Sequence, residues 1–263
     1  MRFARFVHAG GVSFGVVEGS EAALTVAEIE SIPFDDVRFT GQRWALADVR
    51  LLAPIFSSKV IGVGRNYADH AKELGNEVPK EPLIFIKPST TVIGPNDAIR
   101  LPVVSQQVEH EAELAVVIGA TGARRVDRAG AEKAIFGYTV ANDVTARDLQ
   151  RSDPQWTRAK GFDSFCPLGP WIVTDLDVSD LEVRCEVGRN PDAMEVRQLG
   201  RTKDMIFDVP TLISYVSHVM TLLPGDVILT GTPAGVGTIV TGDTVSCTVQ
   251  GIGSINNPVV TLD

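Results

Sequence analysis

The sequence is poor in cysteine and has no long apolar run. Cys166, Cys185 and Cys247 are the three cysteines among 263 residues. Because their number is odd and their spacing fits no metal-binding pattern, they predict small buried side chains in a reducing cytosol, not a disulfide framework. No apolar stretch approaches the roughly 18 residues of a membrane-spanning helix. The N-terminus "MRFARFVHAGG" lacks the apolar region of a signal peptide. We therefore expect a cytoplasmic protein without a membrane partner.

Positive charge is also scarce. The chain has 24 Lys and Arg against 33 Asp and Glu, a net charge of -9. Nucleic acids and anionic membranes bind clusters of Lys and Arg, so neither is expected as a partner. The stretch "TGTPAGVG" lacks the Gly-Lys-Ser/Thr ending of a P-loop, and "GVGRNY" lacks the third glycine of a dinucleotide fingerprint. Nucleotide binding is therefore not expected.

Short apolar runs bounded by glycine and proline dominate the rest of the chain. "FARFVHAGGVSFGVVEG" reads as two strands around a Gly-Gly turn, so residues 1–56 are predicted to form a small N-terminal β domain. "KVIGVG" and "PLIFIKP" are typical of buried strands and open a second, larger domain over residues 57–263. Many short strands with few helices predict a β-rich α+β fold.

Two helices stand out from this pattern. Asp127 is a predicted N-cap for the helix in "VDRAGAEKAIFG". Asp208 is the predicted N-cap of the longer helix in "DVPTLISYVSHVMTLLPGD", which Pro224-Gly225 is expected to stop. Its predicted apolar stripe consists of Leu212, Ile213, Val216, Val219 and Met220.

Three carboxylates alternate just before a strongly apolar run in "QVEHEAELAVVIG". Strand side chains alternate faces, so Glu109, Glu111 and Glu113 would project on one side and repel one another without a positive neighbour. Hard divalent cations prefer oxygen ligands, which makes Glu111, Glu113 and Asp143 of "TVANDVTARD" candidate ligands for Mg²⁺. The alternative is an ordinary solvated strand end.

Two further segments carry candidate catalytic groups. In "RNYADHAKE", His70 and Glu73 are neighbours on a helix, so the carboxylate can orient the imidazole as a general base; the alternative is a surface pair. Lys160, in "WTRAKGFDSFCPLGP", would bind an anion or an enolate, or is an ordinary surface lysine. The remaining histidines are expected to be structural or exposed.

The order of these blocks is more specific than any one of them. "VGRNYADHAKE", "FIKPST", "EHEAELAVVIG", "NDVTARDLQ", "AKGFDSFCPLGP" and "GDVILTGTPAGVG" together resemble the fumarylacetoacetate hydrolase superfamily over about residues 58–263. The chain is most similar to the short bacterial branch named for acylpyruvate hydrolases, oxaloacetate decarboxylases and 5-carboxymethyl-2-hydroxymuconate isomerases. Residues 1–56 resemble the small N-terminal domain found in part of that branch. The implied catalytic fold is a mixed β-sheet sandwich or roll.

The resemblance implies a metal site and a base. Glu111, Glu113 and Asp143 match the family's metal carboxylates, which hold Mg²⁺ or Mn²⁺. His70 and Glu73 match the pair that activates water, on a segment that closes over substrate in relatives. Family members are commonly homodimers, so a homodimer is expected here.

The resemblance also implies substrate contacts. Lys160 matches the lysine that stabilises an enolate, Gln150 a substrate-contacting glutamine, and Thr232 a contact to the substrate carboxylate. Arg65 and Tyr67 are further candidate substrate-binding residues. The longer fumarylacetoacetate hydrolases have an acidic residue where this chain has Arg65, which argues against fumarylacetoacetate as the substrate.

The function that follows is a Mg²⁺-dependent enzyme acting on a small 2-oxo acid through an enolate. Hydrolysis of an acylpyruvate or decarboxylation of oxaloacetate is the first expectation, and isomerisation of 5-carboxymethyl-2-hydroxymuconate is the alternative. A non-catalytic binder of 2-oxo acids belongs to a different class. The retention of all three carboxylates with His70 and Lys160 favours an enzyme.

Overall fold

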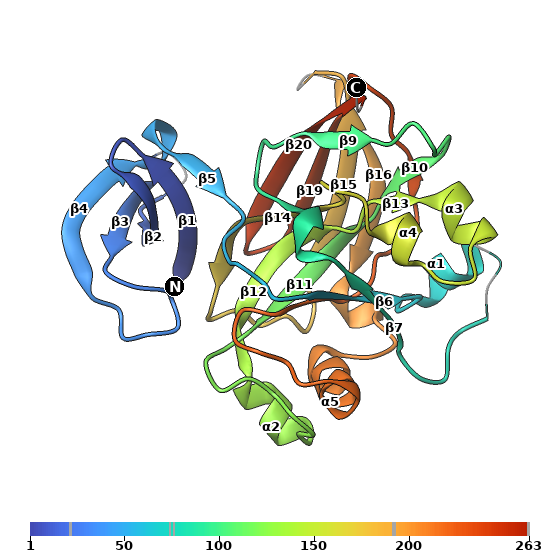
Figure 1. Cartoon of the computed structure of the whole chain (residues 1–263), viewed down its shortest axis with the longest axis horizontal. Coiled ribbons are helices and arrows are strands. Elements are labelled where there is room, and N and C mark those ends of the chain that lie inside the picture. Colours follow the sequence, from blue (N-terminus) through green and yellow to red (C-terminus); the bar gives the residue numbers. More distant parts are fainter. Residues whose placement is uncertain (21–22, 74, 76, 191–192, 262–263) are drawn as a thin grey trace.

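The structure is a computed structural model that describes residues 1–20, 23–73, 75, 77–190 and 193–261. Strands dominate it and helices are few and short, as the sequence predicts for a β-rich α+β fold (Figure 1). None of the helices formed by the described residues has the length and apolar character needed to cross a bilayer.

The largest sheet runs through both predicted domains. Its main path, in spatial order, is β4 (Phe39–Ala45), β3 (Thr25–Ile29), β2 (Gly11–Glu18), β1 (Arg2–His8), β14 (Cys166–Val173), β12 (Ile135–Asn142), β11 (Ala112–Ile118), β17 (Val227–Leu229), β6 (Val60–Gly64) and β7 (Leu83–Lys87). Off this path, β5 (Arg50–Leu52) pairs with β1, and β8 (Val92–Ile93) pairs with β14. The strand runs predicted around the Gly-Gly turn are confirmed as β1 and β2.

Two smaller sheets complete the β structure. One has the order β16 (Glu195–Arg201), β15 (Glu182–Gly188), β19 (Thr244–Val249), β20 (Gly253–Thr261) and β9 (Ile99–Leu101). The other joins β13 (Thr145–Ala146), β10 (Val108–His110) and β18 (Gly237–Thr238). A large apolar cluster contains side chains from both β11 and β15, so the largest sheet and the sheet that contains β15 share a core.

The N-terminal strands lie at one side of the molecule (Figure 1). They bury a small apolar cluster of their own, built on Phe6 and Val26, yet β1 also pairs with β14 at Arg2 and Phe3. The N-terminal unit therefore has its own core while extending the main sheet. The boundary near residue 56 stays a prediction.

The helices are α1 (Ala68–Glu73), α2 (Arg128–Lys133), α3 (Arg147–Ser152), α4 (Thr157–Lys160) and α5 (Val209–Val219). Short 3-10 turns occupy Leu46–Asp48, Ser89–Thr91 and Thr202–Asp204. Both predicted N-caps are confirmed, because the Asp127 side chain accepts from the Gly130 N–H and the Asp208 side chain from the Thr211 N–H.

The predicted end of α5 is wrong. The helix stops at Val219, before Pro224, because Met220 already has an extended backbone. Val219 is 57% exposed, so it does not belong to the buried stripe that Leu212 and Val216 form. The helical period no longer governs side chains where the helix ends.

Candidate active site

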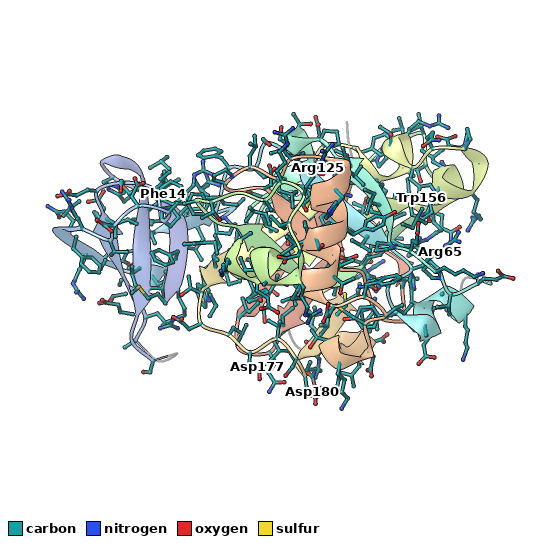
Figure 2. The ribbon with its side chains drawn as sticks, turned by 90° about the horizontal axis from the view of Figure 1, so that it is seen from below. Phe14, Arg65, Arg125, Trp156, Asp177 and Asp180 are labelled. Carbon is teal, nitrogen blue, oxygen red and sulfur yellow. The ribbon has the colours of Figure 1, made fainter. Side chains whose placement is uncertain are left out.

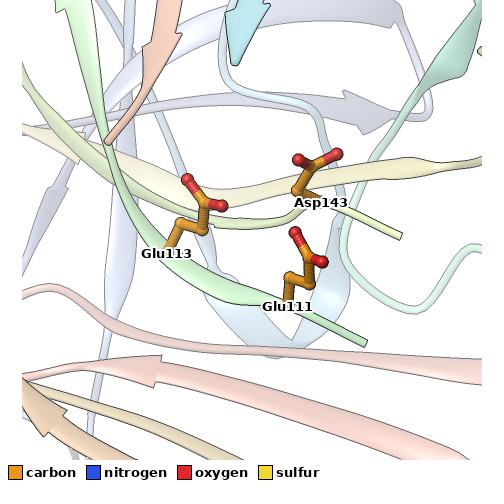
Figure 3. A group of neighbouring side chains, drawn as sticks. All are labelled: Glu111, Glu113 and Asp143. Carbon is orange, nitrogen blue, oxygen red and sulfur yellow. The ribbon is translucent and has the colours of Figure 1, made fainter. Parts of the chain in front are cut away.

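Three carboxylates meet where β11 begins and β12 ends. Glu111 lies between β10 and β11, and its N–H donates to Asn142 Oδ1 (2.9 Å) at the end of β12. The Asp143 N–H in turn donates to the Glu111 carbonyl (2.9 Å). Glu113 follows on β11, opposite Ala141. One ligand atom from each carboxylate lies within 4.8 Å of the others, and all three side chains are buried (Figure 3).

Basic side chains surround this group. Lys160 Nζ donates to Glu111 Oε2 (2.8 Å) and Asp143 Oδ2 (2.7 Å). Lys87 Nζ donates to Asp143 Oδ1 (2.6 Å). Arg147 contacts Glu111 with one nitrogen and donates with Nε to Glu109 Oε2 (2.7 Å). Buried cations thus separate carboxylates that would otherwise repel one another.

Protonation equilibria differ sharply within the group. Burial opposes ionisation of Glu111, but Lys160 and Arg147 outweigh it and hold the pKa of Glu111 below its ordinary value. Burial likewise opposes the charge on Lys160, and the carboxylates of Asp143 and Glu111 outweigh it, so the pKa of Lys160 is raised. For Glu113, burial and then the charges of Asp143 and Glu111 raise the pKa well above the ordinary value.

Among the described residues, no basic side chain forms a salt bridge that would balance the negative charge of Glu113. Its carboxylate accepts a hydrogen bond from the Gly231 N–H (2.6 Å), and among the described residues it forms no salt bridge. A divalent cation between the three carboxylates would supply the missing positive charge, and three buried oxygen donors suit Mg²⁺ or Mn²⁺. The donor set therefore fits the predicted metal.

The predicted general base, His70, and its partner Glu73 lie together on α1. His70 Nδ1 lies 3.2 Å from Glu73 Oε2, and because a carboxylate only accepts, Nδ1 is the donor. His70 is 5% exposed, and Glu73 also accepts from the Gly235 N–H (3.0 Å). This arrangement leaves Nε2 of His70 as the nitrogen that can take a proton. The predicted closing segment includes Leu74 and Asn76, which lie outside the described residues.

One cavity of about 510 Å³ joins these groups. Every site residue predicted from the sequence lines it, except Tyr67. Tyr67 is 3% exposed, and its hydroxyl has no hydrogen-bond partner among the described residues. Burial, followed by the charge of Glu113, raises the pKa of Tyr67. Substrate contact through Tyr67 stays a prediction, and a ligand in this cavity would reach the other residues first.

Two predicted substrate contacts already have partners in the protein. The Thr232 hydroxyl donates to the Ala112 carbonyl (2.8 Å) and accepts from Gln198 (2.7 Å). The Thr232 hydroxyl proton is therefore already in a hydrogen bond to Ala112, and a substrate carboxylate could accept it only if that bond were broken. Gln150 Oε1 accepts from Arg147 (2.6 Å), which leaves the side-chain amide N–H groups of Gln150 to donate.

The lining of the cavity includes a basic side chain, Arg65, and an aromatic one, Trp156. The Arg65 guanidinium carbon lies 5.9 Å from the centre of the Trp156 ring. Figure 2 shows both residues at the end of the molecule opposite Phe14 of the N-terminal strands. Arg65 has φ 59°, a left-handed conformation that is costly for a residue with a side chain. Such strain is concentrated at functional sites.

Sequence reasoning missed three charged or polar members of the site. Lys87 pairs with Asp143 and Arg147 pairs with Glu111. Gln198 accepts a hydrogen bond from the N–H of Ala112, which lies between the two glutamates of the triad. A charged residue inside the apolar run "PLIFIKP" was a usable signal for Lys87, because lysine is almost never fully buried without a partner. The prediction that the remaining histidines are structural or exposed is confirmed for His110, which is buried against Gln198 (2.9 Å).

A model of the fumarylacetoacetate hydrolase C-terminal family matches residues 59–260. The chain belongs to the fumarylacetoacetate hydrolase family. Residues 1–54 match a second model, named Rv2993c-like, N-terminal.

Relatives in the fumarylacetoacetate hydrolase family carry several names. Protein Rv2993c of Mycobacterium tuberculosis is 53% identical and covers 99% of this chain and 98% of its own. The human mitochondrial oxaloacetate tautomerase FAHD2A is 45% identical over 81% of this chain and 70% of its own. A mitochondrial oxaloacetate decarboxylase of Dictyostelium discoideum is 45% identical over 74% and 89%. These names identify the chain as an enzyme of the family.

Two solved structures extend the comparison. A 5-carboxymethyl-2-hydroxymuconate delta-isomerase from Mycobacterium smegmatis is 54% identical over all of both chains, with a TM-score of 0.91. A maleylpyruvate hydrolase from Sphingobium, solved with manganese(II) and pyruvate, is 32% identical over all of both chains, with a TM-score of 0.79. A family neighbour thus binds manganese, and the triad of Glu111, Glu113 and Asp143 could hold a metal ion.

Proposed function

We propose that the protein is a divalent-cation-dependent enzyme that acts on a small 2-oxo acid through an enolate. Hydrolysis of an acylpyruvate or decarboxylation of oxaloacetate is the proposed reaction. The observation that carries the proposal is the meeting of the carboxylate triad, Lys160 and the His70–Glu73 pair in one cavity. The names of the oxaloacetate decarboxylase and of the manganese- and pyruvate-bound hydrolase support it.

The charge balance of the site favours an anionic substrate once a cation is present. Four carboxylates, those of the triad and Glu109, face three basic side chains, Lys87, Lys160 and Arg147. With every group ionised the cluster therefore carries one excess negative charge. A divalent cation would reverse that sign and attract a carboxylate of the substrate.

Bound by Glu111, Glu113 and Asp143, Mg²⁺ or Mn²⁺ would supply Lewis acidity toward the 2-oxo group. Lys160 would stabilise negative charge that develops on the enolate oxygen, because its ammonium is buried and held in place by two carboxylates. Preorganised charge of this kind acts on the transition state more than on the neutral ground state.

The His70–Glu73 pair would supply the proton transfer. In hydrolysis, Nε2 of His70 would take a proton from water as the water attacks the distal carbonyl, and Glu73 would stabilise the imidazolium through Nδ1. The C–C bond would then break, the acyl fragment would leave as a carboxylic acid, and the electron pair of the broken bond would remain on pyruvate enolate, which is then protonated to pyruvate. Decarboxylation of oxaloacetate leaves the same enolate with CO₂ and needs no attacking water.

Isomerisation of a 5-carboxymethyl-2-hydroxymuconate-type diene is a second candidate. The similarity to the Mycobacterium smegmatis delta-isomerase favours it, and so does a histidine that can move a proton between two carbons of a dienolate. The three reactions share the enolate-stabilising groups and differ in what reaches His70.

A substrate panel tests the proposal. Metal-depleted protein is offered acylpyruvates, oxaloacetate and 2-hydroxymuconate-type dienes, with and without Mg²⁺ or Mn²⁺, and products are identified. We expect turnover of at least one 2-oxo acid that depends on the added cation. Turnover that persists in excess EDTA, or no turnover of any of these compounds, contradicts the proposal. Sedimentation of the same preparation tests the predicted homodimer.

A further inference from the structure

Gln198 is a fully buried polar side chain on a largely exposed strand. It lies on β16, at the edge of the second sheet, where Arg197 and Leu199 on either side of it are exposed. Gln198 itself is 0% exposed. The pairing of β15 with β16 is irregular at this point, since Gln198 pairs with Cys185 and Val196 with Glu186, which leaves Arg197 as an extra residue.

The side-chain amide of Gln198 makes four hydrogen bonds. Its oxygen accepts from the Ala112 N–H (3.0 Å) and from His110 Nδ1 (2.9 Å). Its nitrogen donates to Thr232 Oγ1 (2.7 Å) and to the Pro233 carbonyl (2.8 Å). Two acceptor sites and two N–H groups are the full capacity of a glutamine side chain, so none of it is left for solvent.

These bonds fix the residue between two metal-candidate carboxylates. Ala112 lies between Glu111 and Glu113, and its carbonyl accepts from Thr232, which Gln198 holds. Among the described residues, strand β17 pairs with β11 only from Ala115 to Val117, so no strand of the main sheet pairs with Ala112 on that side. Side chains of Gln198 and Thr232 take the place of a neighbouring strand there.

Strand β16 also supports the loop that contains Pro233 and Gly235 and that contacts Glu73, the partner of His70. A Cβ at Gly200 would lie 2.4 Å from Pro233 Cβ, and a Cβ at Gly235 would lie 2.1 Å from the Arg197 carbonyl oxygen. The loop therefore packs closely on β16, with the Pro233 ring against Gly200 and backbone against backbone at Gly235, and its Gly235 N–H contacts Glu73. Strand β16 thus backs both the carboxylates and the partner of His70.

We propose that Gln198 is a positioning residue that fixes the spacing of Glu111 and Glu113 and thereby sets the protein's affinity for a divalent cation. The proposal rests on the metal site of the proposed function. Gln198 acts through Ala112 and Thr232. Partners that orient metal ligands in this way typically change metal affinity by about 10–100-fold when they are removed.

Calorimetric titration of metal-depleted protein with Mn²⁺ tests this inference without any activity measurement. Gln198→Met keeps the volume and removes all four bonds, and we expect it to weaken Mn²⁺ binding by about 10–100-fold. The control is Val183→Ala, a buried apolar truncation on β15 that removes no hydrogen-bonding group. At a similar loss of melting temperature, Val183→Ala should keep the wild-type affinity.

Thr232→Val and Thr232→Ser provide a second test if Gln198→Met does not fold. The valine removes the link between Gln198 and the Ala112 carbonyl and should weaken Mn²⁺ binding, while the serine keeps the hydroxyl and should bind like the wild type. Equal affinity in wild type, Gln198→Met and Thr232→Val overturns the positioning role alone. A wild-type protein that binds no Mn²⁺ overturns the metal site of the proposed function as well.

Discussion

Two buried carboxylates at opposite ends of one strand pair differ in how they are satisfied. Asp226 precedes β17, and its carbonyl accepts from the Ile118 N–H at the end of β11. Its carboxylate accepts from Ser58 Oγ (2.6 Å), from the Lys59 N–H and ammonium, and from the Leu223 N–H (2.7 Å). Glu113, near the other end of β11, accepts from one backbone N–H and pairs with no cation in the described part of the chain.

The difference separates a structural from a functional acid. A buried charge surrounded by donors stabilises the fold and needs nothing further, whereas a buried acid with one neutral donor costs free energy until a ligand arrives. The fold can keep Glu113 under-satisfied because the apolar remainder of β11 and the saturated Asp226 hold the strand in place.

Glu113→Gln should have the largest effect and sharpens this contrast. The amide keeps an acceptor for Gly231 but removes the charge, so we expect loss of Mn²⁺ binding and a fall in turnover of more than about 10³-fold, equivalent to the several kcal/mol that a catalytic cation supplies. The melting temperature of the metal-free protein should not fall, because the repulsion by Asp143 and Glu111 is relieved. A marked loss of stability would place Glu113 with Asp226 as a structural acid.

His70→Ala tests the second group of the site. Removal of a general base typically costs about 10²–10⁴-fold in turnover, and Mn²⁺ affinity should stay at the wild-type value because His70 is not among the triad. The penalty should be smaller for oxaloacetate decarboxylation than for acylpyruvate hydrolysis, which needs an activated water. Steady-state kinetics on both substrates provide the measurement, and an equal, negligible effect on both would reduce the pair to a structural contact.

Asp226→Asn examines the structural end of the pair. It leaves buried donors poorly matched and breaks an ion pair with Lys59, whose side chain is 20% exposed. We expect a loss of about 3 kcal/mol in the free energy of unfolding, at the low end of the range for a broken buried pair because Lys59 can reach water. Denaturant unfolding measures the loss, and Mn²⁺ affinity of the folded protein should be unchanged. A drop in affinity would show that the two ends of β11 are coupled.

Asp208→Ala should have the smallest effect, since this acid is a half-exposed helix cap. Loss of the N-cap of α5 should cost about 1 kcal/mol, with turnover unaffected. The hydrogen bond from Arg128 contributes most to lowering the pKa of Asp208 to about 2, and the two hydrogen bonds from Thr211 lower it further. The contribution to stability is therefore present above the ordinary pKa of 3.8 and is lost as pH falls through about 2. Comparison of the variant and wild type at pH 6 and pH 2 should show the difference shrink, because Asp208 is partly protonated at pH 2.

Local chemistry made much of this structure readable from the sequence. Caps at Asp127 and Asp208 depend on residues three positions apart, and Glu111 and Glu113 are only two positions apart, Glu111 just before β11 and Glu113 on it. The fold, the family and the presence of an enzyme followed from the order of the motifs.

The missed residues depend on distant pairing. Lys87 is 56 positions from Asp143, Arg147 is 36 from Glu111, and Gln198 is 88 from His110. No periodicity within one segment encodes such contacts, because they arise only when separate strands meet. The exposure of Val219 was missed for the opposite reason, since the helical pattern was extended past Val219, which is the last residue of its helix.

The join between β1 and β14 has a consequence for dissecting the molecule. Strand β14 pairs with β1 at Ile172 and Val173. A shortened chain without the first 54 residues would uncover this pairing edge and leave backbone N–H and C=O groups open to another chain. The N-terminal unit therefore protects this strand edge from edge-to-edge aggregation. We expect its removal to cause aggregation before it affects catalysis.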